Sequence, residues 1–168
     1  MFYILNGQLS KQTAINPSTD RGLQYGDGLF ETMLFKNGEI EFYNDHLDRL
    51  KAGLTFFGFS LEELNPDKLL KETHYLLSEN NIIGDARIKF MLWRKTGGFY
   101  TPTETGFNYS ISVGNFDSTK LPSELNKLGI AKNFQLPKSP LGNFKTINSM
   151  YYVYACLLYT SPSPRDRG

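Results

Sequence analysis

Residues 20–33 read DRGLQYGDGLFETM, and three glycines in this stretch precede a run that is typical of a β-strand. Glycine destabilises a helix or strand interior by roughly 0.5–1 kcal/mol relative to alanine, so Gly22, Gly26 and Gly28 need a geometric reason. The backbone either turns sharply here, as in a tight turn at Asp27-Gly28, or is approached closely by another group. The spacing matches neither a P-loop nor a dinucleotide fingerprint. We expect a loop that leads into a strand.

Two β-hairpins are predicted on either side of this loop. Asn6-Gly7 follows a short apolar run, and Asn37-Gly38 divides the strand-like sequence ETMLFKNGEIEFY. Asn-Gly supplies the positive φ angles that a two-residue hairpin turn requires. Each dipeptide therefore predicts a pair of adjacent antiparallel strands.

The apolar period changes to helical spacing after the second hairpin. Asn44 or Asp45 can cap a helix whose apolar residues recur at three- and four-residue steps, namely Leu47, Leu50, Leu54 and Phe57. Ser60 with Glu63 resembles a capping box and predicts a second helix that ends near Asn80. Two consecutive amphipathic helices are expected.

Strands are predicted again after these helices. ARIKFMLWR, at residues 86–94, reads as one strand, Gly97-Gly98 as a turn, and the apolar residues that alternate with serines at 109–113 as a half-buried strand. Strands, two helices and further strands predict an α+β domain over residues 1–115.

The remainder of the chain is expected to begin a second domain. Prolines indicate a linker at residues 116–126, and residues 127–156 would start the second domain, with a short strand near 129–132 and a helix capped by Thr146. Two Ser-Pro steps in residues 157–168 are followed by no apolar residue. We expect that tail to be disordered and non-native, the second domain to be incomplete, and apolar side chains of the last helix to be exposed. We therefore expect these 168 residues by themselves to be inactive.

Length, composition and net charge argue against several classes of function for this chain. The chain has 168 residues, 40% of them hydrophobic, which is enough for a packed core, and its net charge of +1 gives no reason to expect nucleic acid or a membrane surface as a partner. Cys156 is the only cysteine, and His46 and His74 lack acidic partners at metal-ligand spacing, so neither a disulfide framework nor a metal site is expected. The N-terminus resembles no signal peptide, and a cytoplasmic protein is expected.

Lys145 is the first candidate for chemistry. It is the only charged residue between Lys138 and Arg165, and its neighbours in sequence are largely apolar. Desolvation lowers the pKa of such an amine and makes it a nucleophile toward carbonyl carbon. The alternative is a lysine stem that lies along the surface with its ammonium in water. Because the second domain is incomplete, we expect Lys145 to be substantially exposed.

Arg49 is the second candidate. His46, Arg49 and Gly53 form a stripe beside the leucines of the first long helix, and a guanidinium next to a residue without a side chain could bind phosphate. The alternative is an exposed arginine that pairs with Asp45 or Asp48 on the helix surface.

Taken in order, DRGLQYGDGLFET, HLDRL, ARIKFMLWR and the lysine that opens KTIN resemble the class IV aminotransferases. These are the fold type IV pyridoxal-phosphate enzymes, which include branched-chain and D-amino-acid aminotransferases and 4-amino-4-deoxychorismate lyase. The resemblance covers about residues 2–156. It implies a small N-terminal α/β domain followed by the start of an incomplete second domain, with pyridoxal 5′-phosphate as cofactor, an amino acid and a 2-oxo acid as substrates, and a homodimer when full-length.

The resemblance also implies roles for individual residues. Lys145 would hold the cofactor as a Schiff base and then move the substrate proton, and Arg49 would bind the cofactor phosphate. Tyr25 and Phe30 would line the substrate side of the pocket, and Asn148 would have a supporting polar role.

Two alternatives to amino transfer stay open. Lyase relatives release pyruvate and 4-aminobenzoate, and they often carry threonine where Glu31 stands here, which favours the aminotransferase. Phe99-Tyr100 stands where lyase and D-amino-acid relatives carry a basic residue. The other alternative is an inactive fragment or interaction module, for which the tyrosines near residue 152 could form an interface.

Overall fold

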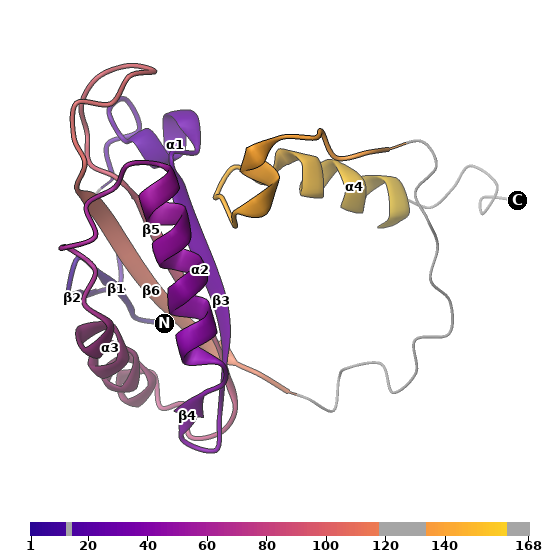
Figure 1. The fold of residues 1–168 in the computed structure, drawn as a ribbon. Helices are drawn as coiled ribbons and strands as arrows, with labels where there is room; N and C mark the ends of the chain where they lie inside the picture. Colours follow the sequence, from indigo (N-terminus) through magenta and orange to yellow (C-terminus); the bar gives the residue numbers. More distant parts are fainter. Residues whose placement is uncertain (13–14, 118–133, 161–168) are drawn as a thin grey trace, which may run out of the picture.

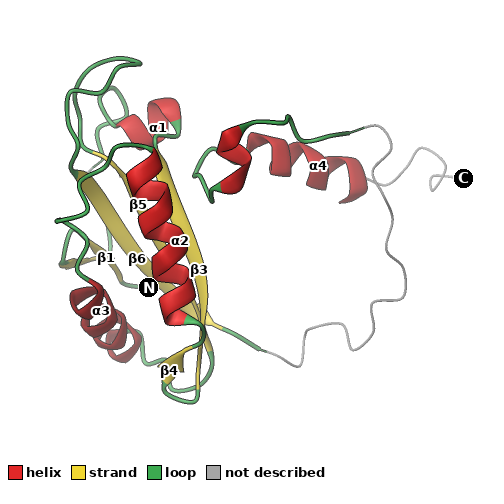
Figure 2. Ribbon diagram, viewed as in Figure 1, coloured by secondary structure: helices red, strands yellow, loops and turns green. Residues whose placement is uncertain are grey.

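The computed structural model describes residues 1–12, 15–117 and 134–160. Its centre is one antiparallel sheet with the strand order β2-β1-β6-β5-β3-β4 (Figures 1 and 2). The strands are β1 (Tyr3–Leu5), β2 (Gln8–Ser10), β3 (Gly28–Lys36), β4 (Glu39–Ile40), β5 (Ala86–Arg94) and β6 (Phe107–Asn115). The prediction of strands, helices and strands in one α+β unit is confirmed.

Both predicted hairpins are present. Asn6 and Gly7 have φ angles of 50° and 84°, and Asn37 and Gly38 have 52° and 88°. These left-handed conformations join β1 to β2 and β3 to β4 in the registers Leu5↔Gln8 and Lys36↔Glu39.

Helices α2 (Tyr43–Phe56) and α3 (Pro66–Glu79) bury their apolar stripes on one face of the sheet. α2 packs on β3, and α3 packs on β6 and β1. The core combines helix leucines with alternate strand residues: Ile4, Leu29, Met33, Leu47, Leu50, Leu54, Leu69, Leu76, Leu77, Ile88, Phe90, Leu92, Ile111 and Val113. The helices therefore cover one face of the sheet and fix the positions of the strands that carry the site.

The predicted caps of these helices were wrong. The N-cap of α2 is Phe42, with φ 54° and no side-chain cap hydrogen bond, and neither Asn44 nor Asp45 fills that role. α3 begins at Pro66, where the fixed φ of proline favours the first helical turn, and Asn65 Oδ1 accepts from Lys68 N at 2.9 Å.

The expected capping box of Ser60 and Glu63 does not form. Glu63 instead accepts from Lys95 Nζ at 3.1 Å and from Phe107 N at 3.2 Å, so its carboxylate joins the segment before α3 to β6. The end of the second helix near Asn80 is confirmed.

The opening stretch is not only a loop, because Arg21–Tyr25 form the short helix α1. Asp20 Oδ1 accepts from Leu23 N at 2.9 Å, and Gly26 ends the helix with φ 65°. A short helix, capped by Asp20 at its start and by Gly26 at its end, takes the place of the expected loop before β3.

All three glycines permit close approach, and a Cβ on Gly26 would lie 2.8 Å from Cβ of Asn148. A Cβ on Gly22 would lie 2.8 Å from Cγ of Trp93, and one on Gly28 would lie 2.2 Å from the Leu92 carbonyl oxygen. The glycines therefore have two kinds of reason. Gly26 needs its left-handed φ and also lies against Asn148, whereas Gly22 and Gly28 let α1 and β3 pack against β5.

Residues 145–147 extend the sheet at the free edge of β3. Phe30 N donates to Lys145 O at 2.9 Å, Ile147 N donates to Gly28 O at 3.0 Å, and Thr146 forms an antiparallel bridge with Leu29. This pairing holds the segment extended, and the predicted helix start at Thr146 is therefore wrong.

After the short 3-10 helix η2 (Pro140–Asn143), the last helix is α4 (Met150–Thr160). The tail that was expected to be disordered from residue 157 begins within this helix, and residues 161–168 lie outside the described part. Met150 and Tyr154 are exposed, as expected. The strand near 129–132 and most of the linker at 116–126 also lie outside the described residues. No helix in the described ranges is long and apolar enough to cross a membrane.

Candidate active site

Lys145 lies where its extended segment runs along β3. Its Nζ is 4.7 Å from the centre of the Phe30 ring, and Lys89 Nζ is 5.3 Å from the same ring. Lys145 is half-buried, so the expectation of substantial exposure was wrong. The reason is that main-chain pairing with β3 brings its side chain onto the folded domain.

Burial lowers the pKa of Lys145. The negative charge of Glu31 opposes this shift, while the positive charges of Arg49, Arg87 and Lys89 add to it. The direction agrees with the effect of desolvation predicted from the sequence, and it raises the fraction of neutral amine at a given pH.

Arg49 is bound to Glu31, a residue on the neighbouring strand. Arg49 Nε donates to Glu31 Oε1 at 2.7 Å and Nη2 donates to Oε2 at 2.5 Å, while His46 Nδ1 lies 2.8 Å from Oε2. The alternative reading of Arg49, a surface pair with Asp45 or Asp48, is therefore not what the structure shows. The geometry is a bidentate guanidinium–carboxylate pair with a histidine on the same carboxylate.

The carboxylate of Glu31 is ionised at neutral pH. Burial alone raises the pKa of Glu31, which is only 2% exposed, but hydrogen bonds from Arg49 and His46 outweigh burial and lower the pKa below its ordinary value. The hydrogen bond to Glu31 in turn raises the pKa of Arg49.

Sequence reasoning did not identify Glu31 as a site residue. The available signal was a carboxylate at an inward-facing position of a strand, between Leu29 and Met33 on the same face. A charge at such a position is rarely buried without a partner, and Arg49 and His46 lie on the helix that covers it.

Arg49 keeps donors for a further ligand. Its side chain is 45% exposed, and Nη1 has no hydrogen-bond partner among the described residues. With Lys145, Arg87 and Lys89 nearby and Glu31 as the acidic member, the cluster carries an excess of positive charge. This donor set suits the phosphate of an anionic cofactor.

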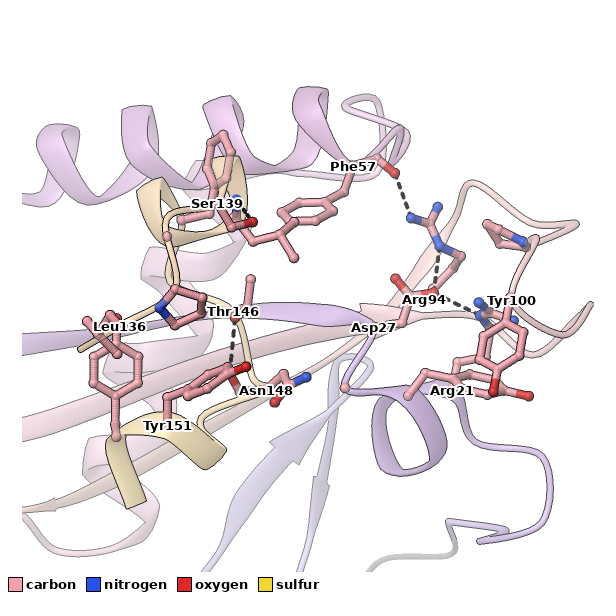
Figure 3. Close-up of a pocket in the computed structure, with 18 residues that line it drawn as sticks. Arg21, Asp27, Phe57, Arg94, Tyr100, Leu136, Ser139, Thr146, Asn148 and Tyr151 are labelled. Carbon is pink, nitrogen blue, oxygen red and sulfur yellow. Dashed lines mark hydrogen bonds and ion pairs between the residues drawn. The ribbon is translucent and has the colours of Figure 1, made fainter. Parts of the chain in front are cut away.

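A cavity of about 640 Å³ lies beside this cluster, between α1 and residues 136–152 (Figure 3). We call it the chamber. Its lining residues are Arg21, Tyr25, Gly26, Asp27, Phe57, Arg94, Tyr100, Pro102, Leu136, Pro137, Ser139, Leu141, Gly142, Phe144, Thr146, Asn148, Tyr151 and Tyr152.

The structure divides the predicted site residues into two adjacent groups. Tyr25 and Asn148 line the chamber, whereas Lys145, Arg49 and Phe30 do not and belong to the charged cluster. The segment that contains Lys145 and Asn148 connects the two groups.

A buried ion network supports the chamber and was also missed from the sequence. Asp27 Oδ2 accepts from Arg21 Nε at 2.8 Å and from Arg94 Nε at 3.0 Å, and both arginine side chains are at most 4% exposed (Figure 3). This ion network joins α1, the start of β3 and the end of β5.

Comparison with known proteins gives the family. The profile of the family described as amino-transferase class IV matches residues 28–158. The chain is 37% identical over 81 residues to D-alanine aminotransferase of Listeria monocytogenes, covering 46% of this chain and 26% of that protein. It is also 46% identical over 39 residues to aminodeoxychorismate lyase of Vibrio harveyi, covering 23% of this chain and 14% of that protein.

The fold is shared with solved aminotransferases. The branched-chain amino acid aminotransferase of Escherichia coli superimposes with a TM-score of 0.68 at 17% identity, over 86% of this chain and 51% of that one. A branched-chain aminotransferase of Thermoproteus uzoniensis gives 0.59 at 22% identity, over 70% and 41%. The chain thus spans about half, or less, of the proteins it matches. On its sequence profile and its fold, this chain belongs to the class IV aminotransferase family.

Proposed function

We propose that this chain carries the cofactor-binding lysine and the phosphate-binding arginine of a pyridoxal 5′-phosphate-dependent aminotransferase. The reaction would move an amino group between an amino acid and a 2-oxo acid. The observation that carries the proposal is the half-buried Lys145, whose pKa is lowered and whose charge interacts with the bidentate pair of Arg49 and Glu31. Aminotransferase relatives support the choice of reaction over the lyase alternative.

The residues fit the cofactor by the chemistry of their donors. Arg49 would bind the phosphate through the donors that Glu31 leaves free, and Lys145 would bind the carbonyl end. When bound, pyridoxal phosphate supplies the electron sink that stabilises negative charge on the substrate carbon.

The chain's own residues would position these groups and move the proton. Glu31 holds the Arg49 guanidinium in one orientation. Burial lowers the pKa of Lys145, which favours the neutral amine, and its Nζ would accept and return a proton. Phe30 supplies a flat apolar neighbour to the amine, while Tyr25 and Asn148 would line the substrate side.

Reductive labelling tests the proposal. The chain is incubated with pyridoxal phosphate, treated with borohydride, and digested for mass spectrometry. We expect the label on Lys145, no label at that peptide in Lys145→Met, and an unchanged result in Lys138→Met. A label on another lysine in the unmodified chain would contradict the role of Lys145.

The phosphate role is tested by the affinity of Arg49→Ala for the same cofactor. We expect a loss of roughly 1.5–3 kcal/mol, the scale of hydrogen bonds to charged groups, with partial recovery in Arg49→Lys because lysine lacks the planar fork. Equal affinities of the alanine variant and the unmodified chain would remove Arg49 from the phosphate site.

The proposal extends to the substrates and the setting. An assay of amino transfer against pyruvate release distinguishes the aminotransferase from the lyase, and we expect transfer to predominate in the full-length protein. A homodimer in the cytoplasm is part of the same proposal.

A further inference from the structure

Arg21 lies in the wall of the chamber with one nitrogen free. Its Nε donates to Asp27, and its Nη1 lies 2.9, 3.1 and 2.6 Å from the carbonyl oxygens of Gly97, Gly98 and Phe99. Nη2 has no hydrogen-bond partner among the described residues, although the side chain is only 3% exposed. Figure 3 shows Arg21 between Asp27 and Tyr100. The buried guanidinium of Arg21 is thus held by hydrogen bonds at Nε and Nη1, whereas Nη2 is left to bind a ligand.

The second arginine of the network has no such free group. Arg94 Nε donates to Asp27, Nη1 to the carbonyls of Gly58 and Glu104, and Nη2 to the carbonyl of Phe57. Its guanidinium also lies 3.9 Å from the centre of the Phe59 ring. Arg94 is therefore a structural residue, and a ligand in the chamber would meet Arg21.

The network carries an uncompensated positive charge. Among the residues that line the chamber, Arg21 and Arg94 face one carboxylate, Asp27. Asp20 forms no ion pair with either arginine among the described residues, and its oxygens accept from Trp93 Nε1 at 2.6 Å and from Leu23 N at 2.9 Å. An anion that binds to Nη2 would neutralise this charge and satisfy the free donor.

The rest of the chamber is largely apolar. Aromatic and aliphatic side chains come from the residue that follows α2 and from the segment after residue 134: Phe57, Leu136, Leu141, Phe144, Tyr151 and Tyr152. The volume of about 640 Å³ is ample for a small organic acid. A ligand that fits both the Arg21 wall and the apolar wall of the chamber has one carboxylate and an apolar body.

We propose that Arg21 forms a carboxylate subsite that binds an apolar amino or 2-oxo acid, with the carboxylate at Nη2 and the side chain among the aromatic residues. That the ligand is a substrate rests on the proposed function. The three carbonyl contacts hold the guanidinium in place before the ligand arrives, which reduces the entropic cost of binding.

Binding of hexanoate and its uncharged analogue hexanamide to the chain, without cofactor, tests the subsite. Trp93 is the only tryptophan and packs against Gly22 of α1, so its fluorescence reports on this wall. We expect saturable binding of hexanoate and at least about tenfold weaker binding of hexanamide, the factor expected when a hydrogen bond to a charged group is lost.

Arg21→Met should weaken hexanoate binding by at least about tenfold, and Asp27 keeps its pair with Arg94 in that variant. Lys95→Met is the matched control, because it removes one positive charge from an exposed pair with Glu63, and it should bind as the unmodified chain does. No saturable hexanoate binding, equal binding of acid and amide, or equal affinity in Arg21→Met and Lys95→Met would overturn the proposal.

Arg21→Lys decides the question if the methionine variant fails to fold. It keeps the charge beside Asp27, but one ammonium cannot serve the carbonyls and the ligand together, so weaker binding is expected and unchanged affinity would overturn the subsite. The test is separate from the proposed function. Loss of labelling at Lys145 with hexanoate binding intact would contradict the cofactor role alone.

Discussion

Glu31 is a carboxylate in an otherwise apolar strand face. Leu29 and Met33, two residues away on either side, are 3% exposed, and Glu31 is equally inaccessible. The covering helix compensates for its burial with Arg49 and His46, so the charge is paired rather than isolated. The same carboxylate opposes the lowering of the pKa of Lys145. One buried acid thus interacts with both Arg49 and Lys145.

Glu31→Gln should reduce the free energy of unfolding at pH 7 by about 1–3 kcal/mol, because the amide cannot replace the charge-assisted pair. The pKa of Glu31 is lowered from its ordinary value of 4.5, so its stabilising contribution is present above that value and is lost as the pH falls through the folded-state pKa. Urea denaturation of both proteins between pH 7 and pH 3 should therefore show the difference shrinking with acidity.

Asp48→Asn provides the matched control. Asp48 is 77% exposed, and its oxygen lies 3.8 Å from Lys51 Nζ, so this substitution should change the free energy of unfolding by less than about 0.5 kcal/mol. A difference for Glu31→Gln that persists unchanged at pH 3 would exclude ionisation of Glu31 as its source.

Some residues of the candidate site can be predicted from the sequence, and others cannot. Lys145 and Arg49 are recognisable because a charge among apolar residues, and a cation on a helix stripe, can be read locally. The Arg49–Glu31 pair joins residues 18 positions apart, and Arg21 meets the carbonyl of Gly97 across 76 positions. Such contacts depend on strand order and register, which a single sequence does not specify.

At the level of elements, Gly28 allows β3 to lie close beside β5. A Cβ there would meet the Leu92 carbonyl oxygen at 2.2 Å, whereas a Cβ on Gly114 in β6 would have no neighbour within 4 Å. We expect Gly28→Ala to destabilise the fold by about 1–3 kcal/mol and Gly114→Ala to change it by less than about 0.5 kcal/mol. Thermal unfolding of the pair measures this, and equal melting temperatures would contradict the close approach.

The start of α3 provides a second comparison between elements. Asn65→Ala removes the acceptor for Lys68 N and should cost about 1 kcal/mol in a denaturation experiment. Ser60→Ala tests the cap that the sequence suggested, and its hydroxyl has no hydrogen bond among the described residues. If Ser60→Ala cost as much as Asn65→Ala, the helix start assigned to Pro66 would be wrong.

Locally determined elements were predictable, and tertiary ones were not. The hairpin turns follow from the backbone freedom of Asn-Gly, so Asn6 and Asn37 were identified correctly. Helical spacing after Thr146 was misleading because pairing of residues 145–147 with β3 outweighs the local preference. In α1, the Asp20 cap and Gly26 are local signals that were read as a turn.

Considered as a whole, the described part of the chain has its buried apolar cluster within the first unit. Every residue of the buried apolar cluster falls between Ile4 and Val113. The segment after residue 134 contacts this unit through Phe144, whose ring lies 4.6 and 5.5 Å from Phe56 and Phe57, and through the pairing with β3. The predicted boundary near residue 115 therefore remains a prediction with a physical basis.

A chain that ends at residue 117 should fold by itself, because it retains every member of the core cluster and all paired strands of the sheet. We expect a single cooperative unfolding transition, measured by circular dichroism, and a broad transition without cooperativity would show that the later segment is required. In the whole chain, Phe144→Ala should speed amide exchange at Phe30 and Ile147, whose N–H groups bond across the β3 edge, while Ile88 in the sheet centre exchanges as before. Unchanged exchange at both edge positions would mean that main-chain pairing holds the lysine segment without the aromatic contact.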